Sequence, residues 1–145
     1  MKVQNLMESF SDSCCLACCY NVMAYYHMNK EFPSDKMIVD GLWKAYFSTK
    51  YLGDDATVND AEQLLKYWTG DRAVVEKLYD MESINKLLNS NEMFIAMYSY
   101  HKGDDATKIG HFVIMQGRKI VFNSLDWSKN VATGVITTVR KITWK

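Results

Sequence analysis

The spacing of apolar residues changes partway along this 145-residue chain, and that change limits the possible folds. Up to about residue 90, apolar side chains recur every three or four positions, which is the period of a helix with one buried face. The run EMFIAMYSY (92–100) is instead continuously apolar, and the segments after it alternate in the manner of strands. We therefore expect an α+β fold, in which an N-terminal helical half packs on a C-terminal antiparallel sheet.

The expected elements follow from these periods and from the residues that interrupt them. Four helices are expected, over 14–28, 35–47, 57–68 and from 81 to about 89. Strands are expected at 73–79, 92–100, 111–115, 120–123 and 134–144. Gly117 lies between two of these strands and predicts a hairpin turn there.

Composition narrows the class of protein. Apolar residues make up 48% of the chain, which excludes a disordered chain, and the length suits a single domain over 1–145. The 17 basic and 17 acidic residues cancel, so no nucleic-acid partner is expected. The chain shows neither a secretory signal nor a run of about 20 apolar residues. We therefore expect no membrane partner and a cytoplasmic location.

All four cysteines lie within six positions, as Cys14, Cys15, Cys18 and Cys19. A disulfide is disfavoured, because thiols stay reduced in the cytosol and residues four apart on a helix direct their Cβ atoms poorly for that bond. A structural zinc site usually draws its ligands from two segments, and no second cluster follows downstream. No metal and no cofactor are therefore expected, and Cys18 and Cys19 are interpreted as core residues.

Cys14 is the cysteine best placed for a reaction. Ser11, Asp12 and Ser13 are residue types that cap the start of a helix, so Cys14 falls in the first turn of the expected helix. Backbone N–H groups without partners favour negative charge there and lower the pKa of a thiol. A thiolate at this position can act as a nucleophile when a base accompanies it.

His111 is the preferred base among the three histidines. His27 lies more than three helical turns from Cys14, roughly 20 Å along the axis, and is interpreted as a surface or capping residue. His101 falls in a polar loop and is interpreted as solvated. His111 opens an apolar strand, where a histidine taken alone is most often a core residue with its hydrogen bonds satisfied. The following hairpin returns Asn123 beside it, and Asn123 can accept a bond from one imidazole nitrogen while the other faces the thiol.

These segments also resemble a known family. SCCLACCYNVMAYY, INKLLNSNEMFIAMYSY and GHFVIM…IVFNSLDW occur in the order found in papain-like cysteine peptidases related to the leader-peptide-cleaving domains of bacteriocin transporters. The resemblance implies a papain-like fold and a cysteine peptidase or amide hydrolase that acts through an acyl-enzyme on a peptide or protein substrate. It places the nucleophile on Cys14, the base on His111 and the orienting residue on Asn123.

The sequence departs from that family's pattern near the nucleophile. The family's glycine after the catalytic cysteine is Cys15 here, and Glu8 stands at the position of its oxyanion-hole glutamine. A carboxylate cannot donate to an oxyanion, and Gln4 replaces that donor only if the N-terminal segment bends suitably. The family's Asp-Pro pair is also absent, which makes Asp126 a second candidate, beside Asn123, for the orienting role.

Three alternatives remain open from the sequence. The first is a catalytically degenerate papain-like binding module, which the change to Glu8 favours. The second is an acyl or amide transferase on the same site, which differs only in the nucleophile that is admitted. The third is a small redox or metal protein built on the cysteine cluster. The nine methionines and the aromatic residues are interpreted as core rather than as a ligand groove.

Overall fold

This computed structural model describes residues 14–101, 108–123 and 135–145, and the side chains of residues 14, 15, 55, 99–101 and 108–110 fall outside the description. The protein has an α+β fold, as predicted. The chain divides into two compact units. The helical unit comprises Met1–Val75 with Thr143–Lys145, and the sheet unit comprises Glu76–Ile142. The single domain over 1–145 stays a prediction.

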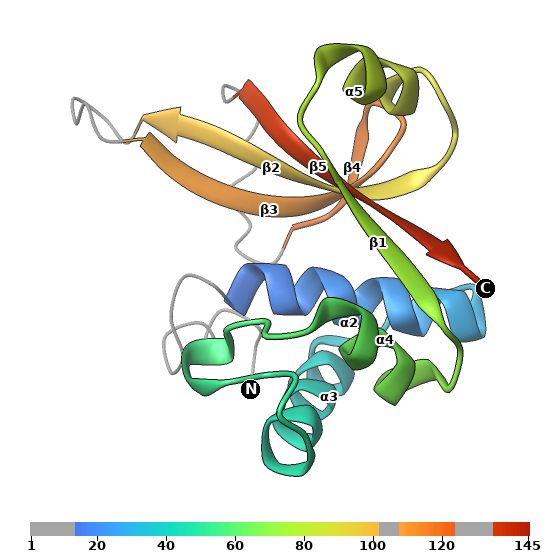
Figure 1. Ribbon diagram of the computed structural model, residues 1–145, viewed down its shortest axis with the longest axis vertical. Coiled ribbons are helices and arrows are strands. Elements are labelled where there is room, and N and C mark those ends of the chain that lie inside the picture. Colours follow the sequence, from blue (N-terminus) through green and yellow to red (C-terminus); the bar gives the residue numbers. More distant parts are fainter. Residues whose placement is uncertain (1–13, 102–107, 124–134) are drawn as a thin grey trace. The chain divides into compact units, whose positions relative to one another are not determined.

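The described part of the helical unit holds α2 (Cys14–Asn29), α3 (Asp35–Ser48), the 3-10 turn η1 (Asp54–Ala56) and α4 (Ala61–Thr69) (Figure 1). Helix α2 packs against α3, η1 and α4. Its residues from Ala17 to Ala24 are all buried, because almost every side chain in that stretch is apolar. A helix that is apolar on all sides belongs in a core, and α2 is the central element of this unit.

Capping residues set where α3 and α4 begin and where α4 ends. Oγ of Ser34 accepts a hydrogen bond from the backbone N–H of Met37 at 3.3 Å, which starts α3. Oδ1 of Asp60 accepts from the backbone N–H of Gln63 at 3.1 Å and starts α4 in the same way. Gly70, with φ of 78°, ends α4 in the left-handed conformation that glycine adopts at least cost.

The third helix is shorter than the predicted span of 57–68, so that prediction is wrong at its N-terminal end. The backbone N–H of Gly53 donates to the carbonyl oxygen of Thr57 at 2.8 Å, and Leu52 forms an isolated β-bridge with Val58. These bonds hold residues 57 and 58 in a tight extended loop. Asp60 is the N-cap, so α4 begins only at the next residue, Ala61.

The sheet has five antiparallel strands in the order β1–β5–β2–β3–β4 (Figure 1). They are β1 (Ala73–Leu78), β2 (Met93–His101), β3 (Lys108–Gln116), β4 (Lys119–Phe122) and β5 (Val135–Trp144). Each predicted strand is present. His101 is not the loop residue that the sequence predicts, because the β2–β3 ladder continues regularly to the pairing of His101 with Lys108.

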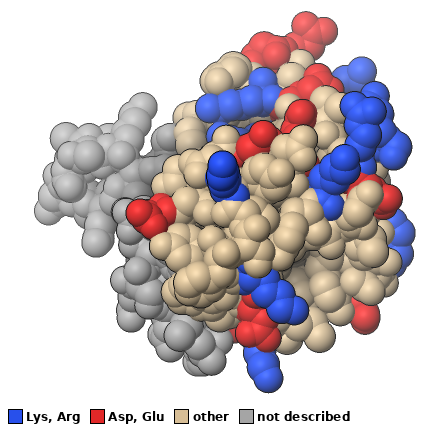
Figure 2. Space-filling view, turned by 60° about the horizontal axis from the view of Figure 1, so that its bottom comes forward, with Lys and Arg blue, Asp and Glu red and all other residues tan. Residues whose placement is uncertain are grey.

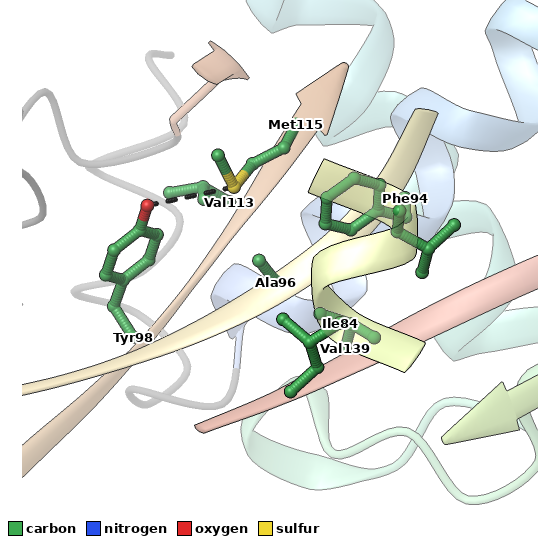
Figure 3. Close-up of a cluster of buried hydrophobic side chains, with 8 residues drawn as sticks. Ile84, Phe94, Ala96, Tyr98, Val113, Met115 and Val139 are labelled. Atoms are coloured by element: carbon green, nitrogen blue, oxygen red, sulfur yellow. Dashed lines mark hydrogen bonds between the residues drawn. The ribbon is translucent and has the colours of Figure 1, made fainter. Parts of the chain in front are cut away.

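Helix α5 (Met81–Leu88) covers one face of the sheet, as Figure 3 shows. Its residues Ile84 and Leu87 pack in a buried cluster with Phe94, Ala96, Tyr98, Val113, Met115 and Val139 from three strands. These strand residues alternate along the chain and so define the α5 face of the sheet. On the opposite face, Ile95 and Ile114 are also completely buried. The centre of the sheet is therefore buried on both sides.

A two-residue hairpin joins β3 to β4, as predicted. Gln116 pairs with Lys119, which leaves Gly117 and Arg118 as the loop. Gly117 has φ of 57°, and a Cβ atom added to it would lie 2.6 Å from the carbonyl oxygen of Ser90. Glycine is thus required here both for the backbone conformation and for the close approach of another backbone.

Candidate functional site

His111 and Asn123 form the polar pair that the sequence predicts. Nε2 of His111 lies 2.7 Å from Oδ1 of Asn123, a short distance for a nitrogen–oxygen hydrogen bond. His111 lies within β3, and Asn123 follows directly after the last residue of β4. The predicted contact is confirmed, whereas the catalytic roles of the two residues stay predictions.

Strand alternation places His111 on the α5 face of the sheet. His111 pairs with Tyr98 across the β2–β3 ladder, and residues directly opposite one another in a ladder share a face. His111 also has the same parity along β3 as Val113 and Met115, which belong to the buried cluster beneath α5. The imidazole therefore stands at the end of a row of apolar side chains.

A β-bulge brings Asn123 to the same face as the histidine. Met115 pairs with Ile120, but the next printed pair joins Ile114 to Phe122, so β4 carries one extra residue. Because side chains alternate with a period of two, this extra residue reverses the face of everything that follows it. Continuing the shifted register sets Asn123 on the histidine's face, and a regular register would have pointed it away.

The hydrogen bond fixes where the imidazole proton resides. An amide oxygen can only accept a hydrogen bond, so Nε2 of His111 carries the hydrogen and donates it to Asn123. In the neutral ring, the lone pair then lies on Nδ1. Nδ1 is therefore the ring atom that can take a proton from an acidic group such as a thiol.

Burial keeps His111 neutral near pH 7. The residue is only 1% exposed, and this desolvation lowers the pKa of the imidazole below its ordinary value of 6.5. The hydrogen bond to Asn123 raises the pKa, but it offsets only part of the lowering. The ring is thus held in the form that accepts a proton, and it exchanges protons only with groups packed against it.

Sequence reasoning misses Tyr98, which lies directly across the ladder from His111. Its hydroxyl donates a hydrogen bond to Sδ of Met115 at 3.7 Å, and burial raises the pKa of the phenol. Tyr98 therefore stays protonated and supplies a neutral polar edge beside the imidazole. The sequence does contain one indication of its position. Tyr98 follows Phe94 and Ala96 at intervals of two residues in an apolar strand, so all three are expected on the same face of the sheet.

Cys14 is the first residue of α2, so the expected helix start is confirmed. The side chains of Cys14 and Cys15 lie outside the described residues, and the pairing of Cys14 with His111 stays a prediction. Cys18 and Cys19 are both 0% exposed, which confirms their interpretation as core residues. Burial thus separates these two thiols from any reaction at the surface.

Other residues singled out from the sequence fall beyond the described ranges. Gln4, Glu8 and Asp126 all lie outside the described residues, so their roles stay predictions. Within 14–101, 108–123 and 135–145, no three His, Cys, Asp or Glu side chains come together in a way that could hold a metal ion. In that same part of the chain, none of the helices combines the length and the apolar character needed to cross a bilayer.

His27, interpreted from the sequence as a surface or capping residue, lies in the last turn of α2, is partly exposed, and has specific partners. Its Nε2 atom lies 2.9 Å from Oδ2 of Asp71, and its ring stacks on the indole of Trp144 with 3.8 Å between the ring centroids. Both partners belong to the helical unit but are distant in sequence. This histidine therefore ties the end of α2 to the turn after α4 and to the C-terminal residues.

The comparison with protein families gives one match. The model of the family described as "Protein of unknown function, DUF261" matches residues 1–143. The chain therefore belongs to the DUF261 family, and the match spans both units. No curated protein and no solved structure matches the chain.

Proposed function

We propose that this DUF261 protein is a papain-like cysteine peptidase or amide hydrolase. Cys14 is the nucleophile, His111 the base, and Asn123 the residue that orients the imidazole. The observation that carries the proposal is the 2.7 Å hydrogen bond between Nε2 of His111 and Oδ1 of Asn123. It selects the tautomer in which Nδ1 accepts a proton, which is the form that a neighbouring thiol requires.

The start of α2 supports Cys14 as the nucleophile. Backbone N–H groups in the first turn of a helix have no partners within the helix, and together with the helix dipole they stabilise a thiolate. No acidic residue lies in the first turn of α2 to oppose this effect. The same N–H groups, including that of Cys14, supply part of an oxyanion hole.

The proposed reaction proceeds in two stages. The thiol proton of Cys14 passes to Nδ1 of His111, and the sulfur attacks the carbonyl carbon of the scissile amide. The tetrahedral intermediate collapses when the C–N bond breaks, and the departing amine takes the proton from His111. Water then attacks the resulting thioester, with His111 again as base, and releases the acid and the Cys14 thiol. The substrate class is a peptide or protein.

A second candidate function is a papain-like binding module without turnover. The 1% exposure of His111 favours it, because so buried a ring can serve simply to satisfy Asn123 and complete the core. Glu8 at the expected position of the glutamine donor also fits a site that has lost its oxyanion hole.

Alkylation by iodoacetamide across a pH series tests the proposal, with the modified residue identified by mass spectrometry. We expect Cys14 to react rapidly below pH 7, because the proposed thiolate at a helix start would make it more reactive there than an ordinary thiol, whose pKa is about 8.5. Cys14→Ser abolishes both this reaction and the hydrolysis of a peptide library, whereas the matched variant Cys15→Ser retains both. A Cys14 thiol that titrates near 8.5 would refute the enzyme.

The same measurements separate the other functions. A fast-reacting Cys14 thiol with no product from peptide or acyl libraries indicates the binding module. A product that forms only when an amine acceptor is added indicates a transferase instead of a hydrolase. Thiol reactivity and product formation are all measured on the wild-type protein, so differences in folding between variants do not affect this comparison.

A further inference from the structure

The helical unit holds an open cavity that the proposed reaction does not use. It has a volume of about 610 Å³ and lies among α2, α3 and α4. Volumes of this size are typical of ligand sites, which range over roughly 300–1,000 Å³. The lining residues of α2 are Asn21, Ala24, Tyr25, Met28 and Asn29. All lie at least seven residues after Cys14 and so are beyond the first turn of the helix.

Asn21 gives the cavity a specific chemistry. The residue is only 7% exposed and lines the cavity, yet its carboxamide has no hydrogen-bond partner among the described residues. The polar atoms of Asn21 are not among the fully buried atoms that lack a partner, so they reach the open cavity and can bond to what occupies it. Gly41 on α3 makes room for it, because a Cβ atom there would lie 2.5 Å from Nδ2 of Asn21. The amide carries donors on Nδ2 and an acceptor on Oδ1, and it lines the cavity.

The rim of the cavity is apolar and adaptable. Met28, Met37 and Tyr67 line it and are 54%, 49% and 41% exposed, although the sequence predicts methionine and aromatic residues in the core. Methionine side chains are flexible and polarisable, and surfaces that bind varied apolar groups use them often. The indole of Trp68 is held in place by its Nε1–H, which donates to the carbonyl oxygen of Gly41 at 3.1 Å.

The charges at the cavity exclude strongly ionic ligands. Asp40 and Lys44 both line it, so one acidic and one basic group balance. Figure 2 shows the same mixture on a larger scale, since acidic and basic residues are interspersed around a wide uncharged area on one face of the molecule. A phosphate-bearing ligand would find one cation opposed by one carboxylate, which favours a neutral ligand instead.

We propose that this cavity binds an extended peptide segment that carries an apolar side chain. A peptide group offers one N–H and one C=O, which match the acceptor and the donor of the Asn21 amide. The methionines and the aromatic rings receive the apolar side chain. A purely apolar ligand would leave Asn21 unpaired, and a nucleotide would place its phosphates against Asp40.

This site is distinct from the proposed nucleophile. Asn21 lies seven residues after Cys14 on the same helix, which is roughly 10 Å along the axis, and Asn29 lies roughly 22 Å away. The inference concerns binding alone and does not depend on any reaction at Cys14. It can therefore fail while the enzyme stands, and the reverse also holds.

The test uses the full chain and NMR chemical shifts of its backbone amides. The probe is the capped peptide Ac-Ala-Leu-Ala-NH2 at millimolar concentrations, compared with an analogue in which one amide is replaced by an ester. We expect the peptide to shift resonances of the residues that line the cavity, and the ester to bind roughly tenfold more weakly, as for the loss of one buried hydrogen bond.

Variants connect that difference to named residues. In Asn21→Leu, which has nearly the same shape, amide and ester should bind equally. The melting temperature should stay close to that of the wild type, because the Asn21 side chain makes no hydrogen bond within the described residues that the change would remove. Met37→Ala should weaken binding, whereas the matched control Met81→Ala, at an exposed methionine of α5, should not.

Four results would overturn the inference. The first is no shift at the cavity with the peptide. The second is equal binding of amide and ester to the wild-type protein, and the third is binding of free indole, as a small-molecule probe, where the peptide does not bind. Binding that is insensitive to both Asn21→Leu and Met37→Ala also contradicts it. If Asn21→Leu does not fold, Met37→Ala and the ester analogue still decide.

Discussion

Gly117→Ala tests whether the β3–β4 hairpin tip is pressed against the chain before β2. Gly117 has φ of 57°, and a Cβ atom there would lie 2.6 Å from the carbonyl oxygen of Ser90. The left-handed backbone costs about 1–2 kcal/mol for a residue with a side chain. The clash with a backbone atom adds about 1–3 kcal/mol, the usual cost of overpacking. We therefore expect a total loss of about 2–5 kcal/mol of unfolding free energy.

Gly70→Ala is the matched control, because the two glycines differ in one respect. Gly70 has φ of 78°, but nothing lies within 4 Å of a Cβ atom added to it. Only the backbone term applies, so the loss should be about 1–2 kcal/mol. At about 2–4 °C per kcal/mol for a chain of this size, Gly70→Ala should melt about 2–8 °C below the wild type and Gly117→Ala about 4–20 °C below it.

Thermal and urea unfolding, followed by circular dichroism, measure these differences. Asparagine tolerates the left-handed region, so Gly70→Asn should recover much of the stability, whereas Gly117→Asn keeps the clash and should not. Equal losses for Gly70→Ala and Gly117→Ala, or recovery by both asparagine variants, would refute the close approach to Ser90.

Three further predictions concern the polar pair and a helix cap. Asn123→Leu removes the acceptor for the buried Nε2–H of His111, so urea unfolding should show a loss of about 1–3 kcal/mol of unfolding free energy. NMR should also show a lower His111 pKa in that variant. Asn123→Asp keeps an acceptor and adds a negative charge, so it should raise the His111 pKa. Because the folded-state pKa of His111 lies below 6.5, the unfolded chain binds this proton more readily. Stability should therefore fall as the pH drops below about 6.5, by at most about 1.4 kcal/mol per pH unit, and a Tm series should show this component missing in His111→Gln. Asp60→Ala removes the cap of α4 and should cost about 1 kcal/mol in the same unfolding assay, and Asp60→Asn, which keeps a capping oxygen, should cost much less.

The periodicity of apolar residues was enough to predict the elements of this fold. Helix α2 begins at Cys14 as expected, because a run without Gly or Pro follows residue types that cap helices. The hairpin at Gly117 was predictable for a similar local reason. The start of α4 was not, because the Leu52–Val58 bridge that displaces it is a tertiary contact with no periodic signal.

The site was predictable as a list of residues but not as a geometry. The return of Asn123 beside His111 could be expected from a hairpin, yet the face that Asn123 occupies depends on a bulge near Ile120, which no spacing in the sequence indicates. The pair formed by His27 and Asp71 joins segments far apart in the chain. Sequence reasoning therefore interprets His27 from its helix alone and misses its partner.

The most direct test of the central claim is an NMR titration of the His111 ring in the wild type, in Cys14→Ser and in Cys15→Ser. If Cys14 faces Nδ1 as a thiolate, its charge favours the imidazolium. Replacing it by serine should then lower the His111 pKa by about one unit or more. Cys15→Ser should leave that pKa unchanged. A His111 pKa that is the same in all three proteins would mean that the Cys14 thiol does not meet the imidazole, and the proposed enzyme would be contradicted.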